Sequence, residues 1–377
     1  MGIAPLAGVW TRAMRERGHE VEVIAAHPHY PEPIWGRRFR PYTELRDGVR
    51  VLRLPLFIGR SSSRERLLQE ASFLASLTLA SPLLGRPDAI VSTSPSFPAL
   101  LPAMLATRAR RLPWYIWLQD ILPDGALATG YLDDAGAVTR LSRRLERASY
   151  RNAAGVIVLS QSFRENLLRK GVGDEKITVA YNPATITDGP LFGPEPDQPP
   201  RILCMGNIGR SQGLAEIVRD FEGNRELEAM NAVLVIAGSG VAEPEVRAAI
   251  RTDRVEMTGL LDPSQIREQL QRASLGAVTQ SYDAGEFNVP SKLMNYLAAG
   301  MPVIASVRKS SEAARIVTES GSGWIAEPGE FGSTIVTALQ DRAELESRSR
   351  AGHRFAEANL TADALVNRFE AAMGTAR

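Results

Sequence analysis

The sequence predicts an α/β protein of two doubly wound, Rossmann-like domains, and three observations carry this prediction. At 377 residues the chain is too long for one ordinary hydrophobic core and suits two. In both halves, apolar runs of strand length alternate with segments of helix length, which is typical of parallel sheets covered by helices. A stretch that reads as a linker separates the halves, and its prolines are Pro190, Pro194, Pro196, Pro199 and Pro200.

The amino-acid composition limits the classes of protein to which this chain can belong. The hydrophobic share of 44% and the charged share of 23% are those of a soluble globular protein. Cys204 is the single cysteine, which excludes an internal disulfide framework and a cysteine-based zinc site. The sequence opens without a signal-peptide pattern, and its best apolar run, residues 71–84, is too short and too rich in Ser and Thr to cross a bilayer. We therefore expect a cytoplasmic protein.

The formal net charge of +1 hides an asymmetry between the two halves. Residues 1–186 carry 25 basic and 17 acidic side chains, whereas the remainder carries 19 and 26. The first half is therefore expected to meet something anionic, such as phospholipid, nucleic acid or a phosphorylated substrate. The arginine-rich segment 140–151 lacks the interleaved aromatic side chains of a nucleic-acid surface, so we favour a solvated helix face and expect no nucleic-acid partner.

The first half is predicted to begin with a loop over residues 2–8 and a helix over residues 9–17. Strands are expected at residues 21–25, 51–56, 88–93, 113–118 and 155–159. Residues 64–84 predict an apolar helix flanked by arginines, which either packs on the core or lies in a membrane interface. An α/β domain normally starts with a strand, and none precedes the first loop. We expect this strand and its turn upstream of Met1, over roughly 15–20 residues, because its neighbours would otherwise keep unpaired backbone groups.

Two loops of the first half carry candidate binding residues. His27 and His29 follow the strand at residues 21–25. They could bind a metal, but no nearby carboxylate or cysteine completes a site, so a ligand-facing or structural loop is favoured. Gln119 and Asp120 follow the strand at residues 113–118, and the carboxyl ends of parallel strands are where open α/β sheets bind ligands. The alternative for Asp120 is a cap on the next helix.

The second half repeats the strand and helix pattern. Strands are expected at residues 202–205, 233–237, 255–257, 276–279, 302–305 and 323–326, followed by helices at residues 343–357 and 362–373. Three loops at one edge of this sheet could surround a nucleotide diphosphate: residues 206–213, residues 238–240 and the loop ending at Pro290. The alternative for the glycine loops is an ordinary tight turn.

A helix is predicted to begin at Ser291, as its N-cap, and to end at Gly300. Its polar arc holds Ser291, Lys292, Asn295 and Tyr296, and its core arc holds Leu293, Met294 and Leu297. A helix N-terminus with a lysine in its first turn suits a phosphate, although the polar arc could simply be wet. The sequence contains neither a Gly-x-Ser-x-Gly nucleophile elbow nor a His-Glu-x-x-His motif.

These motifs resemble a known family. The residues Gly-Asn-Ile-Gly-Arg-Ser-Gln-Gly-Leu at 206–214 and Val-Pro-Ser-Lys-Leu-Met-Asn-Tyr-Leu-Ala-Ala-Gly-Met-Pro-Val-Ile at 289–304 resemble the GT-B retaining glycosyltransferases of family four. The nearest branch makes bacterial surface polysaccharides and is related to amino-sugar transfer. Arg-Gly-His-Glu-Val at 17–21 and the segment 117–123 also fit, so the resemblance covers nearly the whole chain.

The resemblance implies a division into domains. It implies an acceptor-binding domain over residues 1–186, a linker over 187–200 and a nucleotide-sugar-binding domain over 201–355. A final helix over residues 356–377 would pack back on the first domain.

The resemblance also implies roles for individual residues. The diphosphate would meet Gly209, Arg210, Ser291 and Lys292, the nucleoside Ser239, Gly240 and Asn295, the donor sugar Glu286 and Asn288, and the acceptor His27, His29, Gln119 and Asp120. Chemistry would rest on Arg210, Lys292, Glu286 and Asp120. Arginine and lysine would neutralise the leaving diphosphate, so neither a metal nor another cofactor is expected.

Four positions depart from the family pattern and mark a divergent branch. Asn207 and Gln212 stand where an arginine and a lysine are usual. Asn295 stands where a glutamate usually binds the ribose, and an amide lacks the charge to strengthen that bond. Gln119 stands where a histidine is often found.

The expected function is transfer of a sugar from a nucleotide donor, expected to be UDP-linked, to a glycan or lipid-linked acceptor. The basic first half and the predicted helix at residues 64–84 would suit a peripheral position on the anionic inner face of the plasma membrane. One alternative is a nucleotide-sugar 2-epimerase of similar fold, which would need acid and base side chains in its cleft. Another is an inactive nucleotide-binding homologue.

Overall fold

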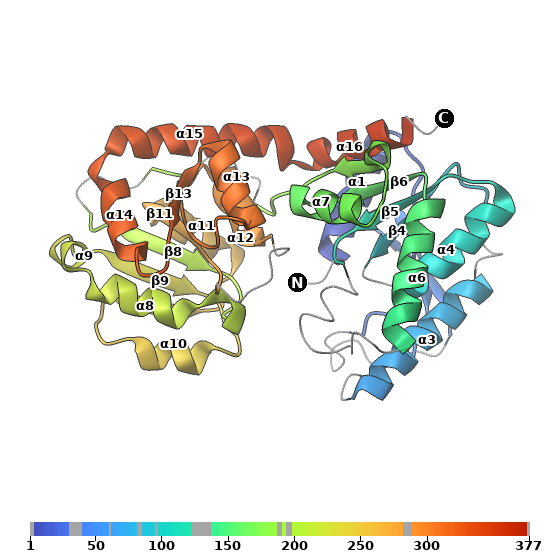
Figure 1. The fold of residues 1–377 in the computed structure, drawn as a ribbon, viewed down its shortest axis with the longest axis horizontal. Helices are drawn as coiled ribbons and strands as arrows, with labels where there is room; N and C mark the ends of the chain where they lie inside the picture. Colours follow the sequence, from blue (N-terminus) through green and yellow to red (C-terminus); the bar gives the residue numbers. More distant parts are fainter. Residues whose placement is uncertain are drawn as a thin grey trace. The chain divides into compact units, whose positions relative to one another are not determined.

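The computed structural model describes residues 4–29, 40–59, 62–80, 85–94, 97–121, 137–186, 191–193, 198–281 and 289–374 (Figure 1). The chain forms two compact units. Unit 1 holds residues 1–181 and 365–377, and unit 2 holds residues 182–364. Each unit contains parallel β-sheet with helices packed on it, which confirms the predicted α/β class with two Rossmann-like domains.

Unit 2 alternates strands and helices along the chain. Its elements are β8 (Arg201–Met205), the 3₁₀ turn η3 (Arg210–Gln212), α8 (Leu214–Gly223), α9 (Arg225–Ala229), β9 (Val233–Ala237), α10 (Glu243–Ala249), β10 (Val255–Gly259), α11 (Pro263–Arg272), β11 (Leu275–Thr279), α12 (Ser291–Ala298), β12 (Val303–Ser306), α13 (Glu312–Ser320), β13 (Gly323–Ala326), α14 (Phe331–Gln340) and α15 (Arg342–Asn359).

The sheet of unit 2 has the order β10-β9-β8-β11-β12-β13, with every neighbouring pair parallel. The chain starts in the middle at β8, builds outward to β10, and then returns to the other side of β8 with β11. The strand order therefore reverses between β8 and β11, and ligands of doubly wound sheets bind at the carboxyl ends of the strands beside such a point.

The four central strands of the unit 2 sheet, β9, β8, β11 and β12, are buried on both faces, which explains their nearly uninterrupted apolar sequences. One face packs against Phe221 of α8, Val246 of α10 and Phe331 of α14, together with Ala277 of β11. Side chains alternate between faces along a strand, so the neighbouring Gly276 points to the opposite face. There it meets the ring of Tyr296, which places α12 on that second face.

Unit 1 has two separate sheets. Its elements are α1 (Ala4–Glu16), β1 (Glu22–Ala26), β2 (Tyr42–Arg46), β3 (Val49–Leu54), α3 (Ser63–Ala80), β4 (Ile90–Ser94), α4 (Phe97–Arg110), β5 (Trp114–Leu118), α6 (Ala137–Asn152), β6 (Gly155–Val158), α7 (Gln161–Arg169), the 3₁₀ turn η2 (Asp174–Lys176) and β7 (Ile177–Val179). One sheet has the order β1-β3-β2, in which only β2 is antiparallel, and the other is the parallel sheet β4-β5-β6-β7.

Among the described residues no strand joins β1 to β4. The upstream residues expected to supply it stay a prediction. The loop expected over residues 2–8 is wrong in part, because α1 begins at Ala4. The sequence also predicts a loop over residues 94–98, after the strand at 88–93, and this is wrong from Phe97, where α4 starts. No helix in the described ranges is both long enough and apolar enough to span a membrane.

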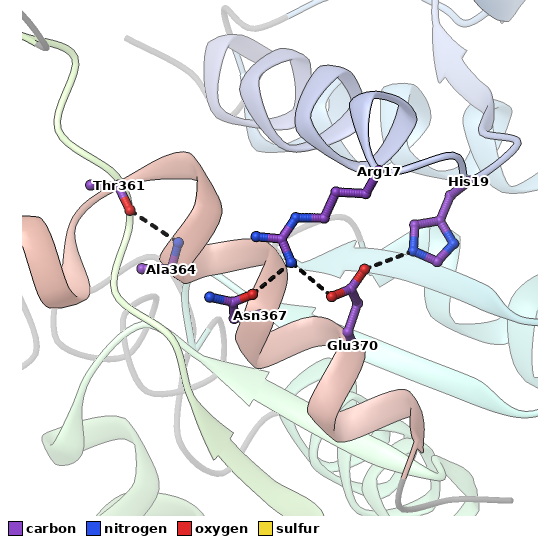
Figure 2. A network of polar contacts seen from close by, with 6 residues as sticks. All are labelled: Arg17, His19, Thr361, Ala364, Asn367 and Glu370. Carbon is purple, nitrogen blue, oxygen red and sulfur yellow. Dashed lines mark hydrogen bonds and ion pairs between the residues drawn. The ribbon is translucent and has the colours of Figure 1, made fainter.

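Helix α16 (Ala362–Gly374) begins in unit 2 and gives residues 365–374 to unit 1. Its Phe369 is fully buried in unit 1, with ring centroids 5.0 Å from Trp10 of α1 and 5.3 Å from Trp117 of β5. Glu370 of the same helix belongs to a polar network with Arg17 and His19 (Figure 2). Arg17 Nη1 donates to Glu370 Oε2 at 2.9 Å, and His19 Nε2 lies 2.9 Å from Glu370 Oε1. The helix is therefore an integral part of unit 1.

Candidate nucleotide-binding site

Two loops and the start of a helix gather at the carboxyl edge of the unit 2 sheet. The first loop, residues 206–213, follows β8, the second, residues 238–240, follows β9, and α12 begins directly after Pro290. Because the strand order reverses between β8 and β11, these loops lie where a doubly wound sheet binds its ligand.

The two loops touch so closely that glycine is required at the contact. A Cβ on Gly238 would overlap the carbonyl oxygen of Gly206, and a Cβ on Gly240 would overlap that of Ile208. Gly238 also has a φ of +150°, which L side chains rarely adopt. Ile208 N donates to Ser239 O at 2.9 Å, so the two loops are hydrogen-bonded as well as packed. Together they form one continuous backbone surface.

Lys292 reaches into this surface from the first turn of α12. Its side chain is only 8% exposed. Nζ donates to Gln212 Oε1 at 2.8 Å and lies 3.7 Å from Cys204 Sγ. Neither partner is a carboxylate, and no carboxylate among the described residues pairs with Lys292. A buried ammonium without a counter-ion is costly, so this site holds a positive charge that an anion would stabilise.

Gln212 has a role that its sequence position did not reveal. It ends η3 in the first loop, at the position where the sequence resemblance implies a lysine. From the sequence alone it counts only as a lost cation. In the structure its side-chain oxygen orients the Lys292 ammonium, so the cation comes from α12 and its positioning group comes from the loop.

Arg210 supplies a second cation from the first loop. It is exposed, and it forms no ion pair within the described part of the chain. The preceding Gly209 is the N-cap of η3 and makes no side-chain capping bond. Gly213 ends the turn in the left-handed conformation, with a φ of +61°. The guanidinium is therefore free to offer its planar donors to a phosphate.

Tyr296 fixes α12 against the sheet, contrary to the expectation of a polar arc. It is fully buried, and its hydroxyl donates to Leu203 O at 2.7 Å and accepts from Met205 N at 2.9 Å. The β8–β11 ladder ends at the pair Gly276 and Leu203, so this hydroxyl bonds the β8 groups where that ladder stops. Burial is the main cause that raises the pKa of Tyr296 well above its ordinary value, which keeps the hydroxyl protonated and able to donate.

Two other residues of α12 differ from their predicted roles. Pro290, not Ser291, is the N-cap, and Ser291 is an exposed residue of the first turn without a capping hydrogen bond. Asn295 Oδ1 accepts from Thr185 N at 2.8 Å and from Ile186 N at 3.3 Å. The side-chain oxygen of Asn295 thus binds the segment entering unit 2, and its contact with a ribose stays a prediction.

The acceptor-side candidates all belong to unit 1. His27 is 3% exposed and its ring lies 5.1 Å from that of Tyr42, so it packs as a core residue at the end of β1. His29 is half-buried, and its Nδ1 lies 2.9 Å from His27 O. Asp120 and the half-buried Gln119 follow β5.

The Asp120 side chain keeps exposed surface, yet the protein around it desolvates its carboxyl group. Desolvation raises the pKa of Asp120 above its ordinary value, and a backbone hydrogen bond from Ile121 opposes that shift. The raised pKa agrees with a ligand-facing carboxylate, although capping residues can also be desolvated.

Thr279 is a site candidate that the sequence did not single out. It is fully buried at the carboxyl end of β11, and within the part of the chain that the structure describes its hydroxyl has no hydrogen-bond partner. Its position at a strand end beside the reversal of strand order was the available signal. Glu286 and Asn288, predicted to contact the donor sugar, lie outside the described residues.

Two family models match the chain. One, described as "Glycosyl transferase 4-like domain", matches residues 1–183, and the other, described as "Glycosyl transferases group 1", matches residues 199–341. The two matches follow one another and together take in the larger part of both units.

Two curated proteins are similar in sequence. The chain is 26% identical over 388 residues to the putative colanic acid biosynthesis glycosyl transferase WcaI of Escherichia coli K12, a match that covers 98% of this chain and 95% of WcaI. It is 25% identical over 311 residues to the probable glycosyltransferase WbjE of Pseudomonas aeruginosa, with 77% of this chain and 76% of WbjE covered.

Solved structures share the fold. Sucrose-phosphate synthase from Thermosynechococcus elongatus has a TM-score of 0.68 at 17% identity, over 100% of this chain and 93% of that chain. HepE from Anabaena, in complex with UDP and glucose, has a TM-score of 0.66 at 15% identity, over 99% of this chain and 96% of that chain. At these identities the likeness shows the fold alone.

Proposed function

We propose, from the premise that this chain belongs to the glycosyltransferases of family four and has the GT-B fold, that it transfers a sugar from a UDP-linked donor to a glycan or lipid-linked acceptor. The transfer retains the configuration at the anomeric carbon and serves surface polysaccharide biosynthesis in the cytoplasm. The name of WcaI, which refers to colanic acid biosynthesis, supports that pathway class, and the HepE complex with UDP supports the nucleotide.

One observation carries the proposal: Lys292 is a buried cation without a carboxylate partner among the described residues. It lies in the first turn of α12, beside a surface made by two glycine loops. Helix N-termini and backbone amides favour negative charge, and a diphosphate brings that charge. The donor's diphosphate is therefore the ligand that this site suits best.

The chemistry follows from the same charges. As the bond between the sugar and the diphosphate breaks, negative charge grows on the leaving oxygen. Lys292 and Arg210 stabilise that charge, and a preorganised cation in a water-poor site lowers the barrier more than it would in water. Unit 2 thus takes the donor. Asp120 and Gln119 of unit 1 stay candidates for the acceptor, and Glu286 and Asn288 stay candidates for the donor sugar.

A panel of nucleotide-sugars tests the proposal directly. The protein is incubated with UDP- and GDP-linked hexoses and acetamido-sugars, with and without short glycan or lipid-linked acceptors, and free nucleotide diphosphate is measured. Release of UDP that depends on the acceptor supports the transferase, and anomeric analysis of the product reports retention. Lys292→Met serves as the matched variant and is expected to lose that release.

The same panel separates the alternatives. Inversion at the sugar C2 without release of nucleotide would instead support the 2-epimerase. Binding of UDP by calorimetry, with turnover absent for every donor and acceptor pair, would support an inactive nucleotide-binding homologue.

A further inference from the structure

The side-chain oxygen of Asn295 on α12 is already occupied by the protein itself. Oδ1 accepts from Thr185 N at 2.8 Å, from Thr185 Oγ1 at 3.1 Å and from Ile186 N at 3.3 Å. A carbonyl oxygen has two lone pairs, so three donors leave it no capacity for a further hydrogen bond. Backbone N–H groups can only donate, which also fixes the orientation of the amide, with its oxygen toward residues 185 and 186.

The segment that occupies this oxygen is itself anchored within unit 2. Ala184 is buried, and its N donates at 2.8 Å to the carbonyl oxygen of Leu360, the C-cap of α15. Residues 182–186 and α12 belong to the same unit. A ligand that needed Oδ1 would have to displace the backbone donors of a segment that is held in place. The oxygen is therefore expected to stay occupied when a ligand binds.

The amide nitrogen of Asn295 is in the opposite situation. Nδ2 makes no hydrogen bond within the described part of the chain. On α12 only positions 291, 295 and 298 are accessible, and the other residues of the helix are buried. Asn295 follows Lys292 by three residues, a spacing that makes two side chains neighbours on a helix surface. An unused donor therefore lies one helical turn from the lysine of the proposed diphosphate site.

A nucleotide carries its pentose directly beside its diphosphate. We infer that Asn295 binds the pentose of the donor through Nδ2 alone, so that the nucleoside subsite takes 2′-deoxyribonucleoside diphosphates about as well as ribonucleoside diphosphates. The inference deepens the proposed function and rests on it, because the proposed function places the diphosphate at Lys292 and Arg210.

The reason lies in what a missing hydroxyl would leave unpaired. A site discriminates strongly against an analogue that lacks a hydroxyl when a polar group of the protein then loses its partner. Oδ1 of Asn295 keeps its partners with either pentose. Nδ2 needs one acceptor oxygen, and the 3′-hydroxyl, which both pentoses carry, supplies it. The donor class therefore includes sugars linked to 2′-deoxynucleoside diphosphates as well as to UDP.

Calorimetry with the full chain tests the inference without turnover. UDP and 2′-deoxy-UDP have the same base and the same diphosphate, and they differ only in the 2′-hydroxyl. Their dissociation constants for the wild type are expected to agree within about three-fold. A preference for UDP of about a hundred-fold or more would overturn the inference, because it would reveal a protein group that requires the 2′-hydroxyl.

Asn295→Asp tests the residue itself. The aspartate keeps one oxygen for residues 185 and 186, and it replaces the amide donor with a charged acceptor that both ribose hydroxyls can reach. The preference for UDP over 2′-deoxy-UDP is expected to rise about ten-fold, because hydrogen bonds to charged groups are the stronger ones. An unchanged preference would show that Asn295 does not touch the pentose, and the inference would fail.

Ser291→Asp is the matched control for the added charge. It places a carboxylate one turn earlier on α12, at an exposed position, and should weaken both nucleotides by the same factor. Lys292→Met should also weaken both equally. Failure of the proposed function looks different: neither nucleotide binds, or Lys292→Met binds both as the wild type does. That result removes the diphosphate from Lys292 and the inference with it, whereas a strong preference of the wild type for UDP overturns the inference alone.

Discussion

Lys292 combines a functional charge with a cost to stability. Replacing Lys292 with Met keeps the apolar stem and removes the ammonium. We expect kcat/KM for the donor to fall by the factor that corresponds to about 2–4 kcal/mol of lost transition-state stabilisation. The reason is that the leaving diphosphate loses one preorganised cation. Steady-state kinetics with varied donor measure the effect, and Arg210→Gln should fall in the same range. Lys309→Met, at an exposed lysine paired with Glu327, is the control and should keep wild-type kinetics.

The same substitution should act in the opposite direction on stability. Without donor, the Lys292 ammonium is desolvated with no carboxylate partner among the described residues, so Lys292→Met is expected to raise the melting temperature of unit 2. Added UDP should stabilise the wild type more than the variant. If Lys292→Met changed neither the stability nor the kinetics, Lys292 would not belong to the diphosphate site.

The Tyr296 hydroxyl is the second residue on which the site depends. Tyr296→Phe leaves Leu203 O and Met205 N without their buried partner, which should cost about 1–3 kcal/mol of unfolding free energy. Because Tyr296 holds the helix that carries Lys292, we also expect a higher KM for the donor.

Chemical denaturation and donor kinetics measure these two effects of Tyr296→Phe. The control is Tyr150→Phe, which removes a buried hydroxyl bound to Glu146 in unit 1. That variant should lower stability without changing the donor KM. A donor KM that stays at the wild-type value in Tyr296→Phe would show that the hydroxyl serves stability alone.

At the scale of single elements, the docking of α16 depends on pH through Glu370. Hydrogen bonds from His19 and then Arg17 lower the pKa of Glu370 below its ordinary value of 4.5, because they favour the ionised form. The folded state therefore gains stability from this group above pH 4.5, and loses it as the pH falls through the lower folded-state pKa.

Melting of unit 1 followed against pH checks this expectation. Glu370→Gln should melt below the wild type at neutral pH, and the difference should vanish at the acid end of that window. A suitable control is Glu357→Gln on α15, which removes an exposed carboxylate of unit 2. A constant difference between Glu370→Gln and wild type at every pH would mean that the amide perturbs packing instead.

The elements that were predicted well and those that were missed differ in burial. Strands β9 and β13 have the predicted bounds, because their short apolar sequences lie largely inside the molecule. Strand β2, with the sequence Tyr-Thr-Glu-Leu-Arg, was missed because it is a largely polar edge strand. Helix α4 was missed, and its first residues were expected to belong to a loop that contains Pro98.

For the candidate site, too, the sequence predicts local features but not the contacts between distant residues. Glycine loops and a lysine at a helix start can be identified from local sequence, and the structure brings those loops together. The bond from Tyr296 to Leu203 joins residues 93 positions apart, and that from Lys292 to Gln212 joins residues 80 apart. Such pairs depend on how α12 packs against β8 and the loop that follows it, and no local sequence pattern encodes that packing.

At the scale of the whole molecule, unit 1 is built from two separate segments of the chain. A substitution in the second segment should therefore lower the stability of the core that the first segment forms. Phe369→Ala removes a fully buried ring from the cluster with Trp10 and Trp117, at a cost of about 3–5 kcal/mol to unit 1. Tryptophan fluorescence reports mainly on this loss, because Trp10, Trp114 and Trp117 belong to unit 1, whereas unit 2 holds Trp324.

The matched variant for Phe369→Ala is Phe331→Ala, which opens the core of unit 2. It should lower a transition that far-ultraviolet circular dichroism detects, while the environment of Trp10 and Trp117 stays native. If Phe369→Ala and Phe331→Ala gave the same melting profile by both probes, the two units would unfold as one.

The contribution of α16 to unit 1 has a consequence during biosynthesis. A ribosome makes residues 1–181 before it makes α16, so their aromatic core lacks Phe369 until residues 182–368 have also been translated. Unit 2 has all its residues by Ala364 and can complete its core earlier. The nascent residues 1–181 must therefore wait, with Trp10 and Trp117 incompletely covered, for α16 to emerge.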